Sequence, residues 1–169
     1  MSGGGDWLPP LITLAEQDGD WVGFDRSIYA AFRAEWVEAR PSMGEKRMAL
    51  KAHPLQHGRE YTYYHLTSAG DDEATRQPDE RRMERIRWPR AMVEAIGTGR
   101  VLMWRNRRAT KSGQKHRILV ALPDFSYVVV LDDRGEYVLL WTAYCVERAH
   151  QREKLRREYE ATNGPRPSR

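Results

Sequence analysis

The chain has few of the features that build crosslinked, metal-bound or membrane proteins. Its 169 residues include one cysteine, Cys145, so no disulfide can form within the chain, and a Cys/His zinc cluster is out of reach. No apolar run approaches the roughly 20 residues that a membrane span needs. The N-terminus lacks the basic segment and apolar core of a secretory signal. We therefore expect one cytoplasmic domain without a metal.

Several signatures of nucleotide-binding proteins and enzymes are absent as well. There is no GxxxxGK[ST], no GxGxxG after a strand, no GxSxG and no HExxH. An enzyme with this sequence would work without a cofactor, through His, Arg, Lys and hydroxyl groups. RNA cleavage suits that set because the 2′-hydroxyl of RNA is itself the nucleophile. The protein need only move protons and stabilise a phosphorane that carries extra negative charge.

Charge is abundant and unevenly placed. Residues 1–80 carry 8 Lys+Arg and 14 Asp+Glu, whereas residues 81–169 carry 20 and 10, which together give the net charge of +4. A basic half of this kind is typical of proteins that bind phosphates. It is equally compatible with a solvated face that pairs with the acidic half. RNA is the polyanion that we favour.

Hydrophobic periodicity predicts an α+β domain that begins with a helix and a pair of strands. Apolar residues recur at three- and four-residue steps between Asp20 and Trp36, which indicates an amphipathic helix. Strands are expected at Lys46–Ala52 and Glu60–Thr67, the second because it is rich in β-branched and aromatic residues. Residues 69–80 are acidic and polar, and we expect a surface loop there.

The second half predicts helices packed on a four-stranded antiparallel meander. A helix starts near Pro78, and Pro89 should break it near Trp88 into two short helices. Short links then force antiparallel neighbours in the sheet. The expected strands are Val101–Arg107, His116–Leu122, Tyr127–Leu131 and Tyr137–Tyr144. A charged helix over about Glu147–Glu160 and a tail complete the chain.

His65 is the best candidate for moving protons. It stands in YTYYHLTSAG, at the end of an expected strand, and histidine titrates near pH 6.5. Its other interpretation is a histidine that is simply hydrogen-bonded at a strand end. His57 and His53, in the preceding HPLQHG turn, could come close to it, although that turn also looks like an ordinary exposed one.

Cations and a hydroxyl group on the expected meander could bind a phosphate. Strand alternation puts Lys115 and Arg117 on one face and His116 on the other. The planar fork of Arg117 matches two phosphate oxygens, but both cations could also be solubilising charges. Thr142, in LLWTAYCV, could donate to a phosphate oxygen. The remaining candidates for substrate contact are Arg87, Trp104 and Tyr144, of which Trp104 is more simply a core residue.

Four segments, YYHLTSAG, RRMERIRWPRAMVEAI, KHRILVAL and LLWTAYCV, stand in an order that resembles the phage-associated branch of the barnase/EndoU/colicin/RelE-like nucleases, the BECR fold. In that family a His-containing segment precedes a helix and a four-stranded antiparallel sheet, whose last strand carries a TAY-type motif. The resemblance covers about residues 60–145. Residues 1–59 have no counterpart, and residues 146–169 form the expected terminal helix and tail of a single domain.

The resemblance implies a metal-independent endoribonuclease, toxin-like or phage-derived. By position, His65 would be the general acid or base, Arg117 with Lys115 would stabilise the pentavalent phosphate, and Thr142 would orient it. Cys145 stands where related strands often have proline. If the protein is a toxin, we expect an antitoxin or immunity protein as a further partner.

The second proton carrier is unassigned, with His57, His116 or Tyr144 as options, and two other functions stay open. A non-catalytic RNA- or ribosome-binding module would use the same basic half. An ADP-ribosyltransferase would use YYHLTS as its opening strand with Tyr127 and Glu147 in later positions, although the short meander fits that fold poorly. The sequence names neither the RNA (tRNA, mRNA or ribosome-associated) nor the oligomeric state.

Overall fold

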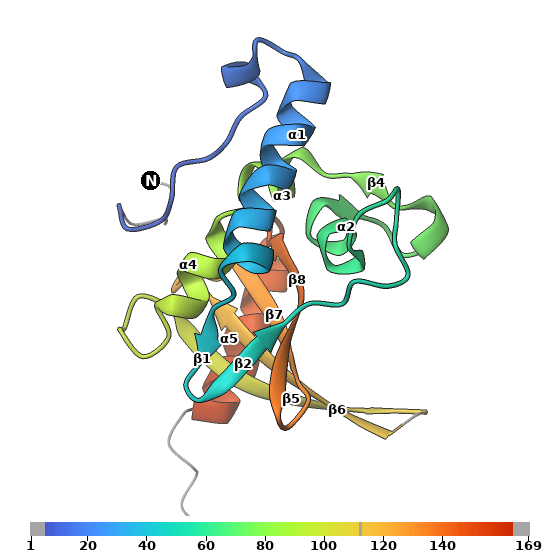
Figure 1. Cartoon of the computed structure of the whole chain (residues 1–169). Helices are drawn as coiled ribbons and strands as arrows, with labels where there is room; N and C mark the ends of the chain where they lie inside the picture. Colours follow the sequence, from blue (N-terminus) through green and yellow to red (C-terminus); the bar gives the residue numbers. More distant parts are fainter. Residues whose placement is uncertain (1–5, 112, 164–169) are drawn as a thin grey trace, which may run out of the picture.

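The computed structural model describes residues 6–111 and 113–163, without the side chains of 108–110 (Figure 1). The expected tail and part of the expected 111–114 link lie outside these residues. The helices are η1 (Ala15–Gln17), α1 (Trp21–Phe32), η2 (Arg33–Glu38), α2 (Tyr61–Thr67), η3 (Glu73–Thr75), α3 (Glu80–Glu84), α4 (Trp88–Glu94) and α5 (Ala149–Asn163). The strands are β1 (Ser42–Met43), β2 (Lys46–Ala49), β3 (Ser68–Ala69), β4 (Gln77–Pro78), β5 (Leu102–Thr110), β6 (Gly113–Ala121), β7 (Tyr127–Asp133) and β8 (Tyr137–Cys145). The mixed α+β class is therefore confirmed.

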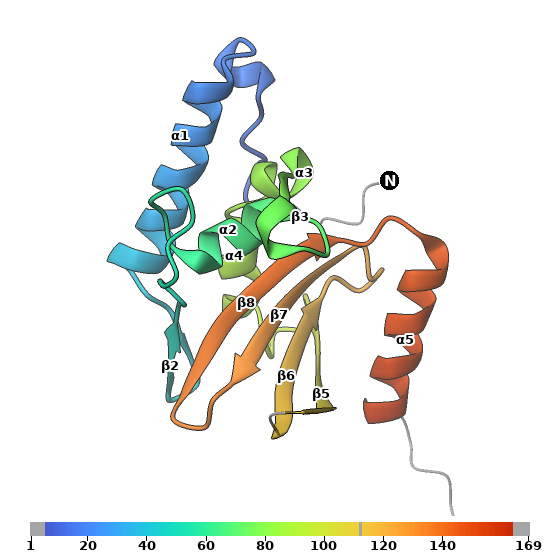
Figure 2. The same ribbon diagram turned by 90° about the vertical axis from the view of Figure 1, so that its right-hand side faces the viewer.

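One curled sheet organises the chain (Figures 1 and 2). Strands β5 to β8 form an antiparallel meander, and β2 joins its β8 edge in parallel, with β1 outermost. The run VVVL lies in β7, between β6 and β8, where a strand is covered on both faces. A bulge at Val130/Leu131 shifts the β7–β8 register, which leaves Trp141 without a residue opposite it.

The two faces of the sheet carry different cores. Ile118 and Val120 of β6 belong to the larger cluster, which includes buried residues of α1, α2, α3 and α4. Leu119 of β6 points the other way and packs with Leu155 of α5. This alternation follows from the two-residue period of a strand. In Figure 2, α5 stands apart from the other helices, across the sheet.

Helix α1 forms where the periodicity predicts it. The Asp20 side chain accepts a hydrogen bond from the Val22 N–H and caps the first turn. Phe24, Ile28 and Phe32 are buried along one side. The helix pair α3 and α4 also matches expectation, because Pro89 stands in the first turn of α4, where its missing N–H costs nothing.

The segment Glu60–Thr67 contradicts the prediction. It forms helix α2 rather than a strand. Strand propensity is a weak preference that packing overrides, and here the Tyr63 ring packs against Phe32 of α1 at 5.2 Å. The buried Thr62 hydroxyl accepts from the Lys51 N–H at 2.9 Å. Leu66 is buried in the same core.

The described residues contain no helix that is both long enough and apolar enough to cross a membrane.

Candidate functional site

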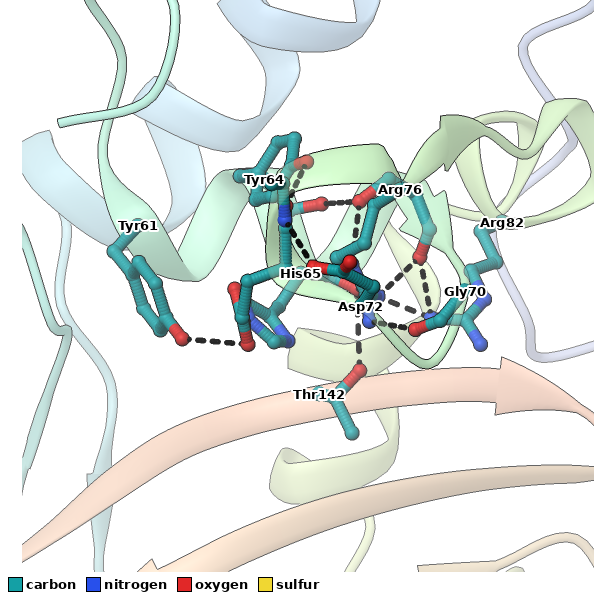
Figure 3. A network of polar contacts seen from close by, with 11 residues as sticks. Tyr61, Tyr64, His65, Gly70, Asp72, Arg76, Arg82 and Thr142 are labelled. Carbon is teal, nitrogen blue, oxygen red and sulfur yellow. Dashed lines mark hydrogen bonds and ion pairs between the residues drawn. The ribbon is translucent and has the colours of Figure 1, made fainter. Parts of the chain in front are cut away.

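Helix α2 carries His65 and Tyr61, whose rings lie close together (Figure 3). The Nε2 atom of His65 lies 2.9 Å from one carboxylate oxygen of Glu73 and 3.1 Å from the other. The Tyr61 hydroxyl donates to the same carboxylate at 2.9 Å. Tyr61 and His65 are one helical turn apart, so they share a face of α2. Both oxygens of Glu73 are thus engaged by this face.

The protonation states follow from these contacts. Burial lowers the pKa of His65, and the nearby Arg76 lowers it further, while Glu73 acts in the opposite direction. Burial opposes ionisation of Glu73, but the hydrogen bonds from Tyr61 and His65 hold its pKa below the usual value. An ionised carboxylate only accepts hydrogen bonds. His65 is therefore neutral near pH 7, with its proton on Nε2 and a lone pair on Nδ1.

The C-terminal end of α2 is held by cations and by β8. The His65 carbonyl accepts from Nη1 of Arg82 at 3.1 Å and from Oγ1 of Thr142 at 3.2 Å. Arg76 and Arg82 both donate to the Ser68 carbonyl. The last carbonyls of a helix lack partners within it and carry partial negative charge, so donors and cations stabilise this end. The Thr142 hydroxyl thus donates its hydrogen to the backbone carbonyl of His65 and helps to position this residue.

Trp141 of β8 connects His65 to the cations of the sheet. The ring centroids of His65 and Trp141 are 5.8 Å apart. On the same indole, the Arg117 guanidinium carbon lies 4.5 Å from the centroid, and the Lys115 and Lys51 amino groups lie 6.0 Å from it. Cations at these distances are attracted to the ring face. One indole thus borders both the predicted proton carrier and the predicted phosphate clamp.

A cavity of about 340 Å³ opens beside this indole. Its lining residues are Asn106, Lys115, Arg117, Leu119, Val130, Trp141 and Tyr144. The predicted pairing of Lys115 and Arg117 on one face of β6 is confirmed, because both line it. His65 is 7% exposed and is not part of this lining. Its ring contacts Trp141, which forms one wall of the cavity.

Three other candidates lie elsewhere. Arg87 donates to the Pro10 carbonyl at 2.8 Å and is held by the N-terminal segment. His57 lines a different cavity, on the α1 side of α2. Trp104 is 2% exposed and donates through Nε1 to Glu158. Its ring fills the core under α5, in agreement with the interpretation of Trp104 as a core residue.

Two of the options for the second proton carrier are absent from the lining of the Trp141 cavity. His116 lines a pocket with Asp132 and Arg134 at the end of the sheet, and His57 lies beyond α2. Tyr144 lines the Trp141 cavity together with Arg117. Two structural premises of the ADP-ribosyltransferase alternative do not hold, because its expected opening strand is helix α2 and because Tyr127 is buried in the core.

Glu73, like Trp141, is a residue of this site that the sequence did not mark as a candidate. It belongs to the acidic segment 69–80, which reads as a solvated loop. The turn formed by η3 folds it back onto α2, where Asp72 caps the Ala74 N–H. The only signal was the nearness of an acidic loop to His65 in the sequence. Within the described residues, no group of three or more His, Cys, Asp and Glu side chains could hold a metal ion.

Comparisons with protein-family models, with curated proteins and with solved structures found no match to this chain. The resemblance to BECR nucleases therefore rests on the sequence segments and their order.

Proposed function

We propose that the protein is a metal-independent endoribonuclease whose substrate crosses Trp141. The observation that carries this proposal is the shared indole: a neutral histidine oriented by a carboxylate borders it, and so do Arg117 and Lys115. A base, an orienting carboxylate and a pair of phosphate-binding cations are the groups that this chemistry needs. The BECR resemblance adds a toxin-like or phage-derived setting.

The reaction uses only groups of the chain and of the RNA. Nδ1 of His65 takes the proton of the 2′-hydroxyl, and the 2′-oxygen attacks the phosphorus. Arg117 and Lys115 stabilise the added negative charge of the phosphorane. The bond from phosphorus to the 5′-oxygen breaks, a 2′,3′-cyclic phosphate forms, and Tyr144, which lines the cavity, protonates the leaving oxygen.

A non-catalytic RNA-binding module is the second candidate, and one observation favours it. His65 is almost buried and is absent from the lining of the Trp141 cavity. The same cations and indole would then bind the RNA backbone and a base, as in proteins that bind single strands. This module would bind RNA in a salt-sensitive manner without producing fragments.

Cleavage of end-labelled RNA in the presence of EDTA distinguishes the two candidates. The parent protein should release fragments that end in 2′,3′-cyclic phosphate. His65→Ala should cleave about 10²–10⁴-fold more slowly and bind the RNA as tightly. His150→Ala, which removes an exposed histidine of α5, is the matched control and should cleave at the parental rate. Binding without fragments from the parent would favour the module.

A further inference from the structure

A second cavity, of about 380 Å³, lies on the opposite side of α2 from Trp141. Tyr63 and Thr67, one helical turn apart, contribute to it from α2, whereas Tyr61 and His65 face the other way. The remaining wall comes from α1, from the turn at residues 56–59, from Ser68 and Pro78 of the β3–β4 pair, and from Arg76 and Met83. Its volume falls within the range of pockets that enclose small organic ligands.

The Tyr63 hydroxyl is the unusual group of this cavity. Tyr63 is 4% exposed, and its hydroxyl oxygen is buried without a hydrogen bond of ordinary geometry in the described part of the chain. The Arg59 guanidinium lies nearby, with its carbon 5.4 Å from the Tyr63 ring centroid, and influences the hydroxyl. Buried hydroxyl groups of tyrosine usually find a partner, because leaving one unpaired costs stability. Burial raises the pKa of Tyr63, so the hydroxyl stays a neutral donor.

The other walls fit a flat ligand with a polar edge. Trp21, His57 and Tyr64 add three more aromatic rings. Arg59 and Asp25, paired at 2.9 Å, put a donor and an acceptor side by side in the lining. Nucleobases have this combination of a π-face, which stacks on aromatic rings, and an edge with donors next to acceptors.

We propose that this cavity binds a nucleobase, stacked on its aromatic wall and hydrogen-bonded along its edge by Tyr63, Arg59 and Asp25. The binding claim stands on the cavity itself. Its extension, that the base belongs to a nucleotide flanking the cleaved bond, rests on the proposed function. The same short helix would then position His65 on one face and a neighbouring base of the RNA on the other.

The test measures binding of AMP, GMP, CMP and UMP to the full chain by calorimetry, together with thermal unfolding. At least one nucleotide should bind the parent. Tyr63→Phe keeps the ring, and it should weaken binding about tenfold, the effect of one lost hydrogen bond. Without nucleotide, Tyr63→Phe should unfold about 2–4 °C higher, because it removes an unpaired buried hydroxyl. Tyr137→Phe, at an exposed tyrosine of β8, is the matched control and should change neither.

Three results would overturn this proposal. The first is that no nucleotide binds at millimolar concentration. The second is that Tyr63→Phe binds nucleotide as tightly as the parent, and the third is that Tyr63→Phe unfolds at a lower temperature than the parent. Binding that Arg117→Ala abolishes and Tyr63→Phe leaves intact also counts against it, because it locates the base at Trp141. If Tyr63-dependent binding is found and the parent does not cleave RNA, the nucleobase site stands and the nuclease proposal fails.

Discussion

At the scale of single residues, the His65 imidazole is subject to opposing influences. Burial lowers its pKa from the ordinary value of 6.5, as do the cations Arg76 and Arg82, whereas the Glu73 carboxylate raises it. Burial and the cations prevail, and the pKa lies below 6.5. A base with a lowered pKa is deprotonated and ready at neutral pH, although it accepts a proton less strongly.

Replacing Glu73 by Gln should lower the pKa of His65 further. The substitution removes a nearby negative charge that favours the imidazolium form. NMR titration of the assigned His65 ring measures the change. Glu45→Gln, which removes an exposed carboxylate in the β1–β2 turn, should leave this titration as it is. A His65 pKa that rises or stays constant in Glu73→Gln would mean that the two side chains do not pair in solution.

The His65 imidazole also makes the free energy of unfolding depend on pH. Because the pKa of His65 is lower in the folded chain than in the unfolded chain, the unfolded chain takes up the proton first as the pH falls. Its contribution therefore lowers the free energy of unfolding as the pH drops below about 6.5, and it vanishes above that pH. Urea unfolding at pH 7.5 and 5.5 should show a smaller difference for His65→Gln than for the parent. The lowered pKa of Glu73 makes the free energy of unfolding depend on pH only below about 4.5, which is outside the range between pH 7.5 and 5.5.

At the scale of elements, α2 depends on partners from distant parts of the chain. The sequence places α1, the α3–α4 pair and the meander correctly, because periodicity, Pro89 and short links are local signals. It misassigns α2, because YTYYHLT has the composition of a strand. Its helical state comes from packing between α1 and β8 and from donors that satisfy its C-terminal carbonyls, such as Arg82.

Thr142→Val tests how β8 holds α2. The substitution removes the hydrogen bond to the His65 carbonyl, so the free energy of unfolding should fall by about 0.5–1.5 kcal/mol. RNA affinity should be unchanged, because the hydroxyl acts on α2. Thr142→Ser keeps the hydroxyl and should restore most of the stability in urea unfolding. A loss of RNA affinity in Thr142→Val, with parental stability, would instead support the phosphate contact that the BECR resemblance implies.

At the scale of the whole molecule, the basic half supplies the cations Lys115 and Arg117 of the Trp141 cavity. The sequence predicts the charge of this half but not the arrangement of the cavity. Charge counts locate the basic half after residue 80, and strand alternation pairs Lys115 with Arg117. The convergence of His65, Lys51 and Arg117 on Trp141 depends on the curl of the sheet and on the bulge in β7–β8. No local pattern encodes either feature, so the sequence alone could not show that one indole joins the two halves of the site.

RNA binding should depend on salt through these cations. Each phosphate contact that a Lys or Arg makes adds about one to the slope of log affinity against log salt concentration. Arg117→Ala and Lys115→Ala should each reduce the slope by about one in fluorescence titrations of a labelled RNA. Arg26→Ala, at an exposed position of α1 in the acidic half, should leave the slope unchanged. Equal slopes for all three variants would place the RNA on another surface.

The most direct measurement of the central claim is single-turnover cleavage of one RNA and of its counterpart with a single 2′-deoxy substitution at the cleaved nucleotide. If His65 deprotonates the 2′-hydroxyl beside Trp141, the parent should cut the RNA and bind but not cut its 2′-deoxy counterpart. His65→Ala should then cut the RNA about 10²–10⁴-fold more slowly, at unchanged affinity. Cleavage of the 2′-deoxy RNA at the parental rate, or undiminished cleavage by His65→Ala, would contradict the account.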